Sequence, residues 1–258
     1  MAKESRVVQL QMDLARLEFK DSLKALNFMI GTMNADNGYK RHDGRHYYYH
    51  LVDGAQDLLN HGVTDEIVIT SYILHDYIED VPDATYEGVL ALFGREVADT
   101  VLGVTKNPDV NYKKGENLKA YLDDMLPFVR MCLVKTADRK HNFSTLKDAT
   151  PEKELRQALE TEKYFLPFFK EARKRFPEYS RYFHSAKTTI MPHLNKIKEH
   201  HAFVAEHERQ IAEIKIYLYD ELQSRFLEDG GVTNQAEVEL VEEIARNIKH
   251  ITKGGTLK

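Results

Sequence analysis

The sequence predicts an all-α protein, and three observations support this fold class. Glycine and proline are scarce, at 13 and 7 of 258 residues, and the alternation of apolar and polar residues that marks a strand is hard to find. Apolar residues instead recur at helical spacing along most of the chain. They make up 42% of the composition, which is enough for a substantial buried core. We therefore expect a helical bundle with a long-helix appendage at its C-terminal end.

The expected helices of the N-terminal half follow from apolar spacing and turn residues. The spacing of Leu10 through Leu26 indicates a first helix, and the polar, turn-rich segment 34–46 follows it. Thr64 is expected to cap a helix whose apolar run, Ile67 to Leu74, delivers a His-Asp pair at its end. The other helices expected in this half span about 47–60, 85–93, 95–104, 117–125 and 127–142, with a polar, lysine-bearing loop at 106–116.

The pattern changes at Thr150-Pro151. Proline is favoured at the first helical position and threonine at the capping position before it, so a helix is expected to begin here. Its amphipathic pattern continues to about Phe176, and Pro177 ends it. This part of the chain is therefore expected to be one long helix.

The last part of the chain reads as a helical extension. Residues 188–228 carry apolar positions at steps of mostly three, four or seven, which indicates a packed seam. Gly230-Gly231 breaks the pattern, and a final helix is expected over about 234–251. We expect a compact domain over 1–180 and a C-terminal extension over 181–258 that packs on the domain or forms a homo-oligomer contact.

Charge and cysteine content narrow the class of protein. The net charge is −5, so no global basic field points to binding of duplex nucleic acid. The single cysteine, Cys132, lies in an apolar run and is expected to be a small core residue. The start of the chain lacks a hydrophobic signal core, and no apolar stretch approaches the roughly 18–20 residues of a membrane span. We expect a cytoplasmic protein without a membrane partner.

The candidate functional residues centre on the pair His75-Asp76, which directly follows the apolar run of its helix. A buried charge in such a place needs a partner or a metal ion. His50 lies upstream and Asp138 downstream, each on another expected helix. Two imidazoles and two carboxylates without a thiolate suit a divalent ion of the Mn, Fe, Zn or Mg kind, and two histidines argue against Mg or Ca alone. Such an ion would lower the pKa of a bound water.

Two further acids follow the pair. Glu79 and Asp80 lie four residues beyond His75 and Asp76, which brings them to the same side if the helix or turn continues. We expect them to transfer protons and orient water rather than to ligate the ion. Structural alternatives stay open, because Asp138 could form a buried ion pair with Arg139 and His50 could be an ordinary core histidine.

The order His, His-Asp, Asp resembles the HD phosphohydrolase superfamily. The finer pattern is similar to the hydrolase domain of the RelA/SpoT family, including its small stand-alone members of the metazoan SpoT homologue type. The resemblance covers roughly residues 35–175. It rests on four stretches, Arg41-x-x-Gly44-x-x-Tyr47-x-x-His50, His75-Asp76-x-Ile78-Glu79-Asp80, Leu92-Phe93-Gly94-x-x-Val97-Ala98 with Gly103-Val104-Thr105-Lys106, and Lys135-x-Ala137-Asp138-Arg139-x-His141-Asn142-x-x-Thr145-Leu146.

The resemblance implies an HD-domain helical bundle that removes the 3′-pyrophosphate from ppGpp and pppGpp. It implies a Mn²⁺ site at His50, His75, Asp76 and Asp138, with Glu79 and Asp80 as catalytic carboxylates beside the attacking water. It also implies that Arg41 packs on the nucleotide base and that Asn142 and Thr145 contact the nucleotide. With the lysine-bearing loop included, the expected substrate-binding residues are Arg41, His42, Tyr47, Lys106, Asn142 and Thr145.

Two other functions stay open from the sequence. The chain departs from the family at His42, Leu51 and Ser144, where lysine, proline and arginine are usual. These changes lie near the expected base-binding edge, so the substrate could be another nucleotide, such as NADPH, a dNTP or a different signalling nucleotide. A regulatory nucleotide-binding protein without turnover is the third reading. The presence of Glu79 and Asp80 beside the metal ligands argues against it.

Overall fold

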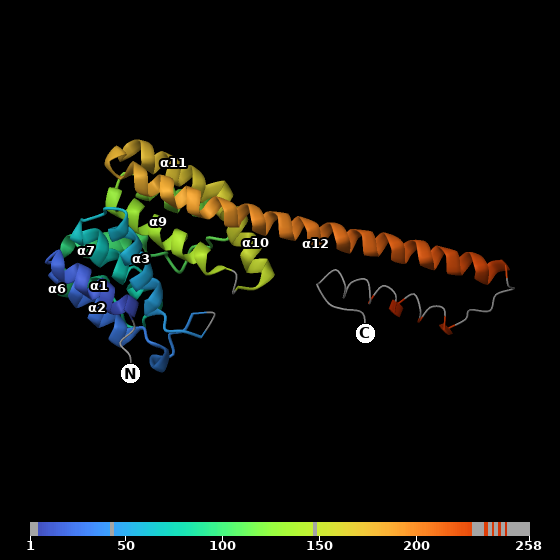
Figure 1. Cartoon of the computed structure of the whole chain (residues 1–258), viewed down its shortest axis with the longest axis horizontal. Coiled ribbons are helices and arrows are strands. Elements are labelled where there is room, and N and C mark those ends of the chain that lie inside the picture. Colours follow the sequence, from blue (N-terminus) through green and yellow to red (C-terminus); the bar gives the residue numbers. More distant parts are fainter. Residues whose placement is uncertain are drawn as a thin grey trace. The chain divides into compact units, whose positions relative to one another are not determined.

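The structure is a computed structural model of the whole chain. It describes residues 5–41, 44–146 and 149–228, the last with side chains to Asp220, and six further positions, which are Gln235, Ala236, Glu239, Glu242, Glu243 and Arg246. The described helices are, in chain order, α1 (Ser5–Arg16), α2 (Lys20–Thr32), η1 (Ala35–Asn37), α3 (Tyr48–Asn60), α4 (Glu66–Leu74), α5 (Tyr77–Asp80), α6 (Tyr86–Phe93), α7 (Arg95–Val104), α8 (Gly115–Met125), α9 (Val129–Ser144), α10 (Pro151–Glu160), η3 (Thr161–Phe165), α11 (Leu166–Arg175), η4 (Pro177–Tyr179) and α12 (Ser180–Glu228) (Figure 1).

Helices account for the secondary structure of the described residues, apart from one isolated bridge between Lys40 and His46. The expected all-α class is therefore confirmed. The chain divides by its contacts into two units, Met1–Leu194 and Asn195–Lys258. None of the helices among the described residues is both long and apolar enough to cross a membrane.

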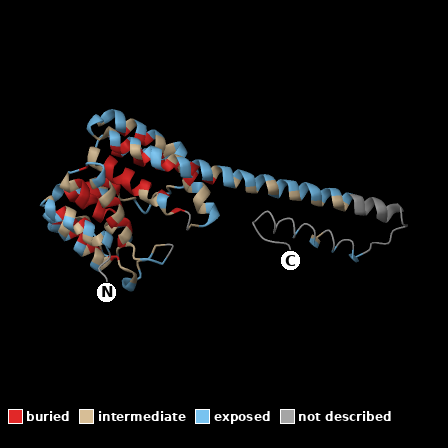
Figure 2. Ribbon diagram, in the orientation of Figure 1, coloured by how far each residue is buried: buried red, intermediate tan, exposed pale blue. Residues whose placement is uncertain are grey.

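Helix α4 is the centre of the first unit. Every residue from Val68 to Leu74 is buried, and the helix packs against α2, α3, α7 and α9. A helix that is apolar on all sides can be stable only inside a core. Figure 2 shows the buried residues gathered in these central helices, and Figure 1 shows α9 between α3 and α7 on one side and α11 on the other. The helices that carry the candidate site residues are thus held by their neighbours.

Two details near the N-terminal end differ from the sequence prediction. The single helix expected from Leu10 to Leu26 is wrong, because the chain turns at Glu18, whose φ is 60°, and α1 and α2 are separate helices. Thr64 was the wrong cap for α4. Asp65 is the capping residue, since its carboxylate accepts a hydrogen bond from the Ile67 amide at 2.9 Å.

The segment that begins at Pro151 also differs in part. Its start is as predicted, with Thr150 as cap and Pro151 in the first turn. The single α-helix expected to about Phe176 is interrupted by the π-helical segment η3, so α10 and α11 are separate. Arg139 from α9 reaches this segment and donates to the Gln157 carbonyl at 2.8 Å and to the Thr161 hydroxyl at 2.8 Å. A widened helical turn of this kind leaves backbone groups that need other partners, and Arg139 supplies one.

Helix α12 begins at Ser180, where the sequence suggested the domain would end. Its first turns belong to the compact unit, because Tyr182, Phe183, Ala186, Ile190 and Leu194 are buried. From 198 to 220 no described side chain of this helix is buried. The apolar seam of the sequence is therefore covered only at its N-terminal end among the described residues. Most of the final helix expected over 234–251 lies outside the described residues.

Candidate metal centre

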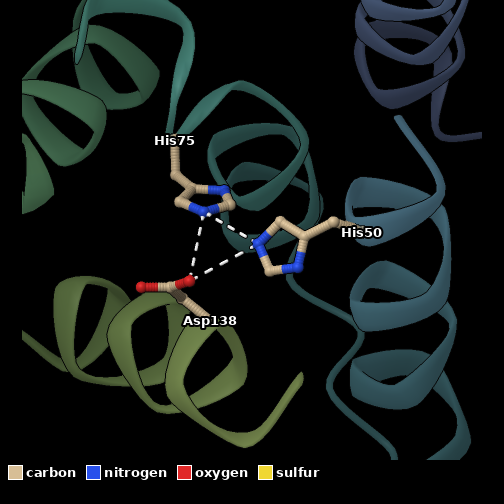
Figure 3. Close-up of side chains that lie close together, drawn as sticks. All are labelled: His50, His75 and Asp138. Carbon is tan, nitrogen blue, oxygen red and sulfur yellow. Dashed lines mark hydrogen bonds and ion pairs between the residues drawn. The ribbon is translucent and has the colours of Figure 1, made fainter. Parts of the chain in front are cut away.

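Three side chains from three helices converge in the core of the first unit. His50 comes from α3, His75 from the end of α4, and Asp138 from α9 (Figure 3). The Nε2 atoms of the two histidines lie 3.3 Å apart, and Asp138 Oδ1 lies 3.4 Å from His50 Nε2 and 3.6 Å from His75 Nε2. All three residues are buried, and one ligand atom from each lies within 4.8 Å of the others. Their donor atoms thus face a common point.

Asp76 lies at the edge of the same cluster. Its Oδ2 atom is 3.0 Å from His75 Nε2 and 3.8 Å from His50 Nε2. The same oxygen accepts a hydrogen bond from the Tyr47 hydroxyl at 2.6 Å. Tyr47, expected to contact substrate, therefore touches an expected metal ligand directly. Its hydroxyl orients the Asp76 carboxylate.

Local contacts hold the other donors in place. His75 is the C-terminal cap of α4, and its Nδ1 lies 2.6 Å from the Tyr72 carbonyl. Because a carbonyl can only accept, Nδ1 carries a proton, and Nε2 is the nitrogen that can bind a metal ion. Asp138 Oδ2 accepts from the buried Lys135 ammonium at 2.9 Å, and Asp138 Oδ1 accepts from the Asn142 amide at 2.6 Å. Such outer contacts orient ligands in metal sites.

The electrostatics favour a cation at this point. Burial lowers the pKa of His50 to about 4, so this imidazole is neutral near pH 7. Burial acts in the same direction on His75, but the Asp76 charge and hydrogen bonds with Asp138 and Asp76 outweigh it and raise its pKa to about 10. The pKa values of Asp76 and Asp138 are lowered despite burial, chiefly by the charges of His75 and Lys135 respectively. A bound metal ion would take the place of the His75 proton.

The structure also bears on the ion pair that was the alternative for Asp138. The Arg139 guanidinium points to η3, to Gln157 and to Glu160, the last at 3.6 Å. Asp138 instead turns toward the two histidines. Two imidazole nitrogens with buried carboxylate oxygens fit a divalent transition metal, so the donor set fits such an ion.

The two following acids lie at the exposed side of the cluster, on the short helix α5. Glu79 accepts from the Lys106 amide at 3.2 Å and lies 3.6 Å from the Lys106 ammonium. Partial burial and the charges of Asp76 and Glu79 raise the pKa of Asp80 to about 6. A cavity of about 830 Å³ adjoins Glu79, and its lining also includes Lys106 and Tyr112. Glu79, the Lys106 ammonium and the cavity thus lie together.

The residues expected to hold a nucleotide form a second cluster. The Arg41 guanidinium donates to Thr145 Oγ1 at 2.7 Å and to Asn142 Oδ1 at 3.2 Å, although the residues are far apart in sequence. It also lies 5.5 Å from the centre of the Tyr47 ring. Asn142 joins this cluster to Asp138. The structure brings together four of the six expected substrate-binding residues here, and Lys106 lies with Glu79; His42 lies outside the described residues.

Two neighbours of the site, Lys135 and His141, stand in the fourth stretch of the resemblance, but neither was assigned a role from the sequence. Lys135 is three residues before Asp138 and His141 is three residues after it, so both lie on the face of α9 that carries Asp138. His141 Nδ1 is 2.7 Å from His50 Nδ1. Their spacing was the available signal, since a lysine and a histidine flank Asp138 at helical intervals.

Fold and site together define an all-α domain with a buried cluster of histidines and carboxylates. The HD domain family matches residues 25–173, which is more than half of the chain. The chain therefore belongs to the HD domain family. This membership implies a divalent metal ion, and His50, His75 and Asp138 form a site that can hold one.

Curated proteins with similar sequences are consistent with this family membership. A probable guanosine-3′,5′-bis(diphosphate) 3′-pyrophosphohydrolase of Synechocystis sp. is 39% identical over 133 residues, which are 50% of this chain and 17% of the relative. The bifunctional (p)ppGpp synthase/hydrolase SpoT of Escherichia coli K12 is 35% identical over 154 residues, 57% of this chain and 22% of the relative. The chain thus spans only about a fifth of the length of these curated relatives.

A solved structure is similar in fold over a larger share of its length. It is that of a metazoan ortholog of SpoT described as hydrolysing ppGpp, with a TM-score of 0.52 and 21% sequence identity. The match covers 69% of this chain and 93% of that protein. At this identity the likeness bears on the fold, and it supports the HD-domain helical bundle expected from the sequence.

Proposed function

We propose that this chain is a Mn²⁺-dependent hydrolase that removes the 3′-pyrophosphate from guanosine 3′,5′-bis(diphosphate). The observation that carries the proposal is the buried cluster of His50, His75 and Asp138, with Asp76 beside it, inside the HD domain. The names of the relatives that match this region support the substrate. Two imidazole donors favour manganese over magnesium.

The metal-binding residues would be His50, His75, Asp76 and Asp138. A divalent ion held by them supplies Lewis-acid activation of water and stabilises negative charge on phosphate oxygens. Tyr47 and Lys135 orient the two carboxylates by direct hydrogen bonds. Because these groups lie on packed helices or directly at their ends, the donors need little rearrangement on binding.

The remaining residues would handle protons and substrate. Asp80, with its pKa of about 6, can accept a proton from the attacking water near neutral pH. Glu79 lies beside it and holds Lys106, whose ammonium can meet a phosphate group. Arg41 can stack on a base while Asn142 and Thr145 fix its orientation. The cavity of about 830 Å³ is in the size range of small-molecule sites.

The proposed reaction is a hydrolysis at phosphorus. Water attacks the phosphorus bonded to the 3′ oxygen, the bond between that phosphorus and the 3′ oxygen breaks, and the 3′ oxygen takes a proton. The products are GDP or GTP and pyrophosphate. Glu79 and Asp80 lie on the exposed side of the cluster, where a substrate phosphate would approach.

A substrate panel tests the proposal. The full chain is incubated with Mn²⁺ and ppGpp, pppGpp, dNTPs or NADPH, and the products are separated by anion-exchange chromatography. Release of pyrophosphate from the guanosine tetra- and pentaphosphates, well above turnover of the others, supports the proposal. Preferred turnover of NADPH or a dNTP would mean that this nucleotide, and not ppGpp, is the substrate. Saturable nucleotide binding without turnover of any compound would instead favour a regulatory binding protein.

A further inference from the structure

His50 is the proposed metal ligand whose second ring nitrogen faces another side chain rather than the backbone. We propose that His141 is a positioning residue, which, assisted by Asp53, holds His50 in the tautomer that leaves Nε2 free for the metal ion. This inference rests on the proposed metal site and adds to it a chain of side chains that reaches the surface of the first unit.

The geometry around His50 assigns its two nitrogens different tasks. The ring is buried, and Nε2 faces His75 Nε2 at 3.3 Å and Asp138 Oδ1 at 3.4 Å. Nδ1 lies 2.7 Å from His141 Nδ1. A contact this short between two ring nitrogens is a hydrogen bond, so one of them carries a proton and the other accepts.

Only one direction of this hydrogen bond allows His50 to bind a metal ion. If His141 donated, the neutral His50 ring would carry its proton on Nε2, where no lone pair would remain for the ion. If His50 donates from Nδ1, its Nε2 is a free donor atom. In that state His141 accepts at Nδ1 and carries its own proton on Nε2.

The surroundings of His141 favour this second direction. His141 Nε2 lies 3.6 Å from Asp53 Oδ2, so the carboxylate attracts a proton on that nitrogen. Arg6 holds the same Asp53 oxygen at 2.7 Å and lies 4.7 Å from the centre of the Tyr49 ring. The contacts thus run from Arg6 in α1 through Asp53 in α3 and His141 in α9 to His50 at the metal site.

His75 provides the contrast. Its Nδ1 meets the Tyr72 carbonyl at 2.6 Å, an acceptor supplied by the backbone of the same helix. No substitution of a side chain can remove that acceptor. His50 depends instead on a residue 91 positions away in the chain, so its orientation can be tested by mutation.

The test compares an acceptor with a non-acceptor at position 141. Asn places its carbonyl oxygen near the position of His Nδ1 and can accept from His50, whereas Leu has similar bulk and cannot accept. The variants are His141→Asn, His141→Leu and Asp53→Ala in the full chain, with His193→Leu as control at an exposed histidine of α12. The readout is the Mn²⁺ dissociation constant by titration calorimetry without nucleotide, with circular dichroism to verify folding.

We expect His141→Leu to weaken Mn²⁺ binding about 10- to 100-fold, which is typical for loss of a partner behind a metal-binding histidine. His141→Asn should restore most of the affinity, Asp53→Ala should cause a smaller loss than His141→Leu, and the control should bind as the wild type does. Nitrogen-15 spectra of the metal-free wild type should show His50 protonated at Nδ1.

Equal Mn²⁺ affinity of folded His141→Leu and wild type would overturn the inference, as would a His50 proton on Nε2. If the Leu variant does not fold, the Asp53→Ala and His141→Asn variants decide, since wild-type affinity in the first or a loss of about 10-fold or more in the second contradicts the inference. The proposed function fails separately, when the wild type binds Mn²⁺ but does not hydrolyse ppGpp. A wild type that binds no Mn²⁺ overturns both.

Discussion

At the scale of single residues, Asp138 lies between the two histidines of the candidate metal centre and the buried Lys135. We predict that Asp138→Ala abolishes Mn²⁺ binding and hydrolysis together, because the carboxylate faces both histidines. The variant should also lose about 3–5 kcal/mol of unfolding free energy, since it leaves the Lys135 ammonium buried without its partner. Urea denaturation and metal titration measure the two effects.

A double variant separates the two roles of Asp138. Lys135→Met with Asp138→Ala removes the buried charge along with its partner, so stability should recover while Mn²⁺ binding stays lost. Retained metal affinity in either variant would show that Asp138 is not a ligand. A double variant as unstable as the single one would show that the ion pair is not the cause.

Glu79 should separate metal binding from turnover. We predict that Glu79→Gln binds Mn²⁺ as the wild type does but turns over ppGpp about 10²- to 10⁴-fold more slowly, the usual effect of losing a proton-handling group. Stability should change by at most about 0.5 kcal/mol, because Glu79 and its partner Lys106 are both partly exposed. Glu152→Gln, on the exposed side of α10, is the matched control for steady-state kinetics. Wild-type turnover in the Glu79 variant would exclude the assigned role.

Asp80 gives a prediction for pH. Its pKa in the folded protein is raised to about 6 from an unfolded value of 3.8, so folding favours the neutral acid. The resulting destabilisation is absent below pH 3.8, develops between pH 3.8 and about 6, and is complete above. Asp80→Asn should therefore stabilise the metal-free protein by about 0.5–1 kcal/mol at pH 8, a figure reduced for solvent screening, and not at pH 4. Urea denaturation with a chelator at both pH values measures this. Equal effects at pH 4 and pH 8 would contradict the assigned cause.

The residues of the site were predictable from sequence to different degrees. His50, the pair His75-Asp76 and Asp138 stand out because acids and imidazoles in apolar helices need partners, and the structure brings them together. Tyr47 was expected at the substrate but contacts Asp76, since a side-chain direction depends on the packing of two helices. The role of His141 depends on a contact across the fold that no local pattern records.

At the scale of helices, the contact between α3 and α4 positions both histidines. A Cβ atom on Gly54 would lie 1.9 Å from the Tyr72 hydroxyl, so α4 approaches α3 closely at this point. The Tyr72 hydroxyl donates to the His50 carbonyl, and the Tyr72 carbonyl accepts from His75. The spacing of the two helices therefore sets the distance between the two imidazoles.

Gly54→Ala tests this contact. We predict a loss of about 1–3 kcal/mol of unfolding free energy, because Tyr72 must move in a fully packed core, together with weaker Mn²⁺ binding. Gly31→Ala is the matched control, since no atom lies within 4 Å of its added Cβ in α2. It should raise stability by about 0.5–1 kcal/mol. Similar effects of the two substitutions in thermal denaturation would refute the proposed close approach.

Most helices were predictable because apolar spacing dominates their sequences, as in α7, whose bounds match the expectation. The helix boundaries that were predicted wrongly have physical causes. The turn at Glu18 uses a positive φ that no glycine or proline announces, and capping by Asp65 rather than Thr64 is a choice between neighbouring cap residues. The π-helical segment η3 is stabilised by Arg139 from another helix, so its own sequence does not reveal it.

At the scale of the whole molecule, the first turns of α12 belong to the metal-binding unit. Lys140 of α9 lies 2.8 Å from Asp57 of α3, and Tyr182 and Ser185 of α12 contact the same pair. From the sequence, the boundary between the compact domain and the C-terminal extension was expected near residue 180. The sequence could not show that one face of the helix is buried up to Leu194, because the apolar spacing continues without a break into the exposed part of the helix.

Truncation tests how much of α12 the unit needs. A chain ending at residue 202 should unfold cooperatively and bind Mn²⁺ as the full chain does. A chain ending at residue 179 should be unfolded, because it loses buried residues that include Tyr182, Phe183, Ile190 and Leu194, each contributing about 1.5–3 kcal/mol against a total stability of about 5–15 kcal/mol. Circular dichroism and thermal denaturation distinguish the two. Equal stability of both chains would mean that α12 is not part of the compact unit.

The central claim is that this chain uses its metal-binding cluster to direct water at the phosphorus bonded to the 3′ oxygen of ppGpp. The most direct measurement is hydrolysis of ppGpp by the full chain with Mn²⁺ in ¹⁸O-labelled water, followed by mass spectrometry of both products. We predict one labelled oxygen in the released pyrophosphate, unlabelled GDP, and no reaction after chelation of the metal. Label in the nucleotide, metal-independent release, or no pyrophosphate from the metal-loaded protein would contradict the claim.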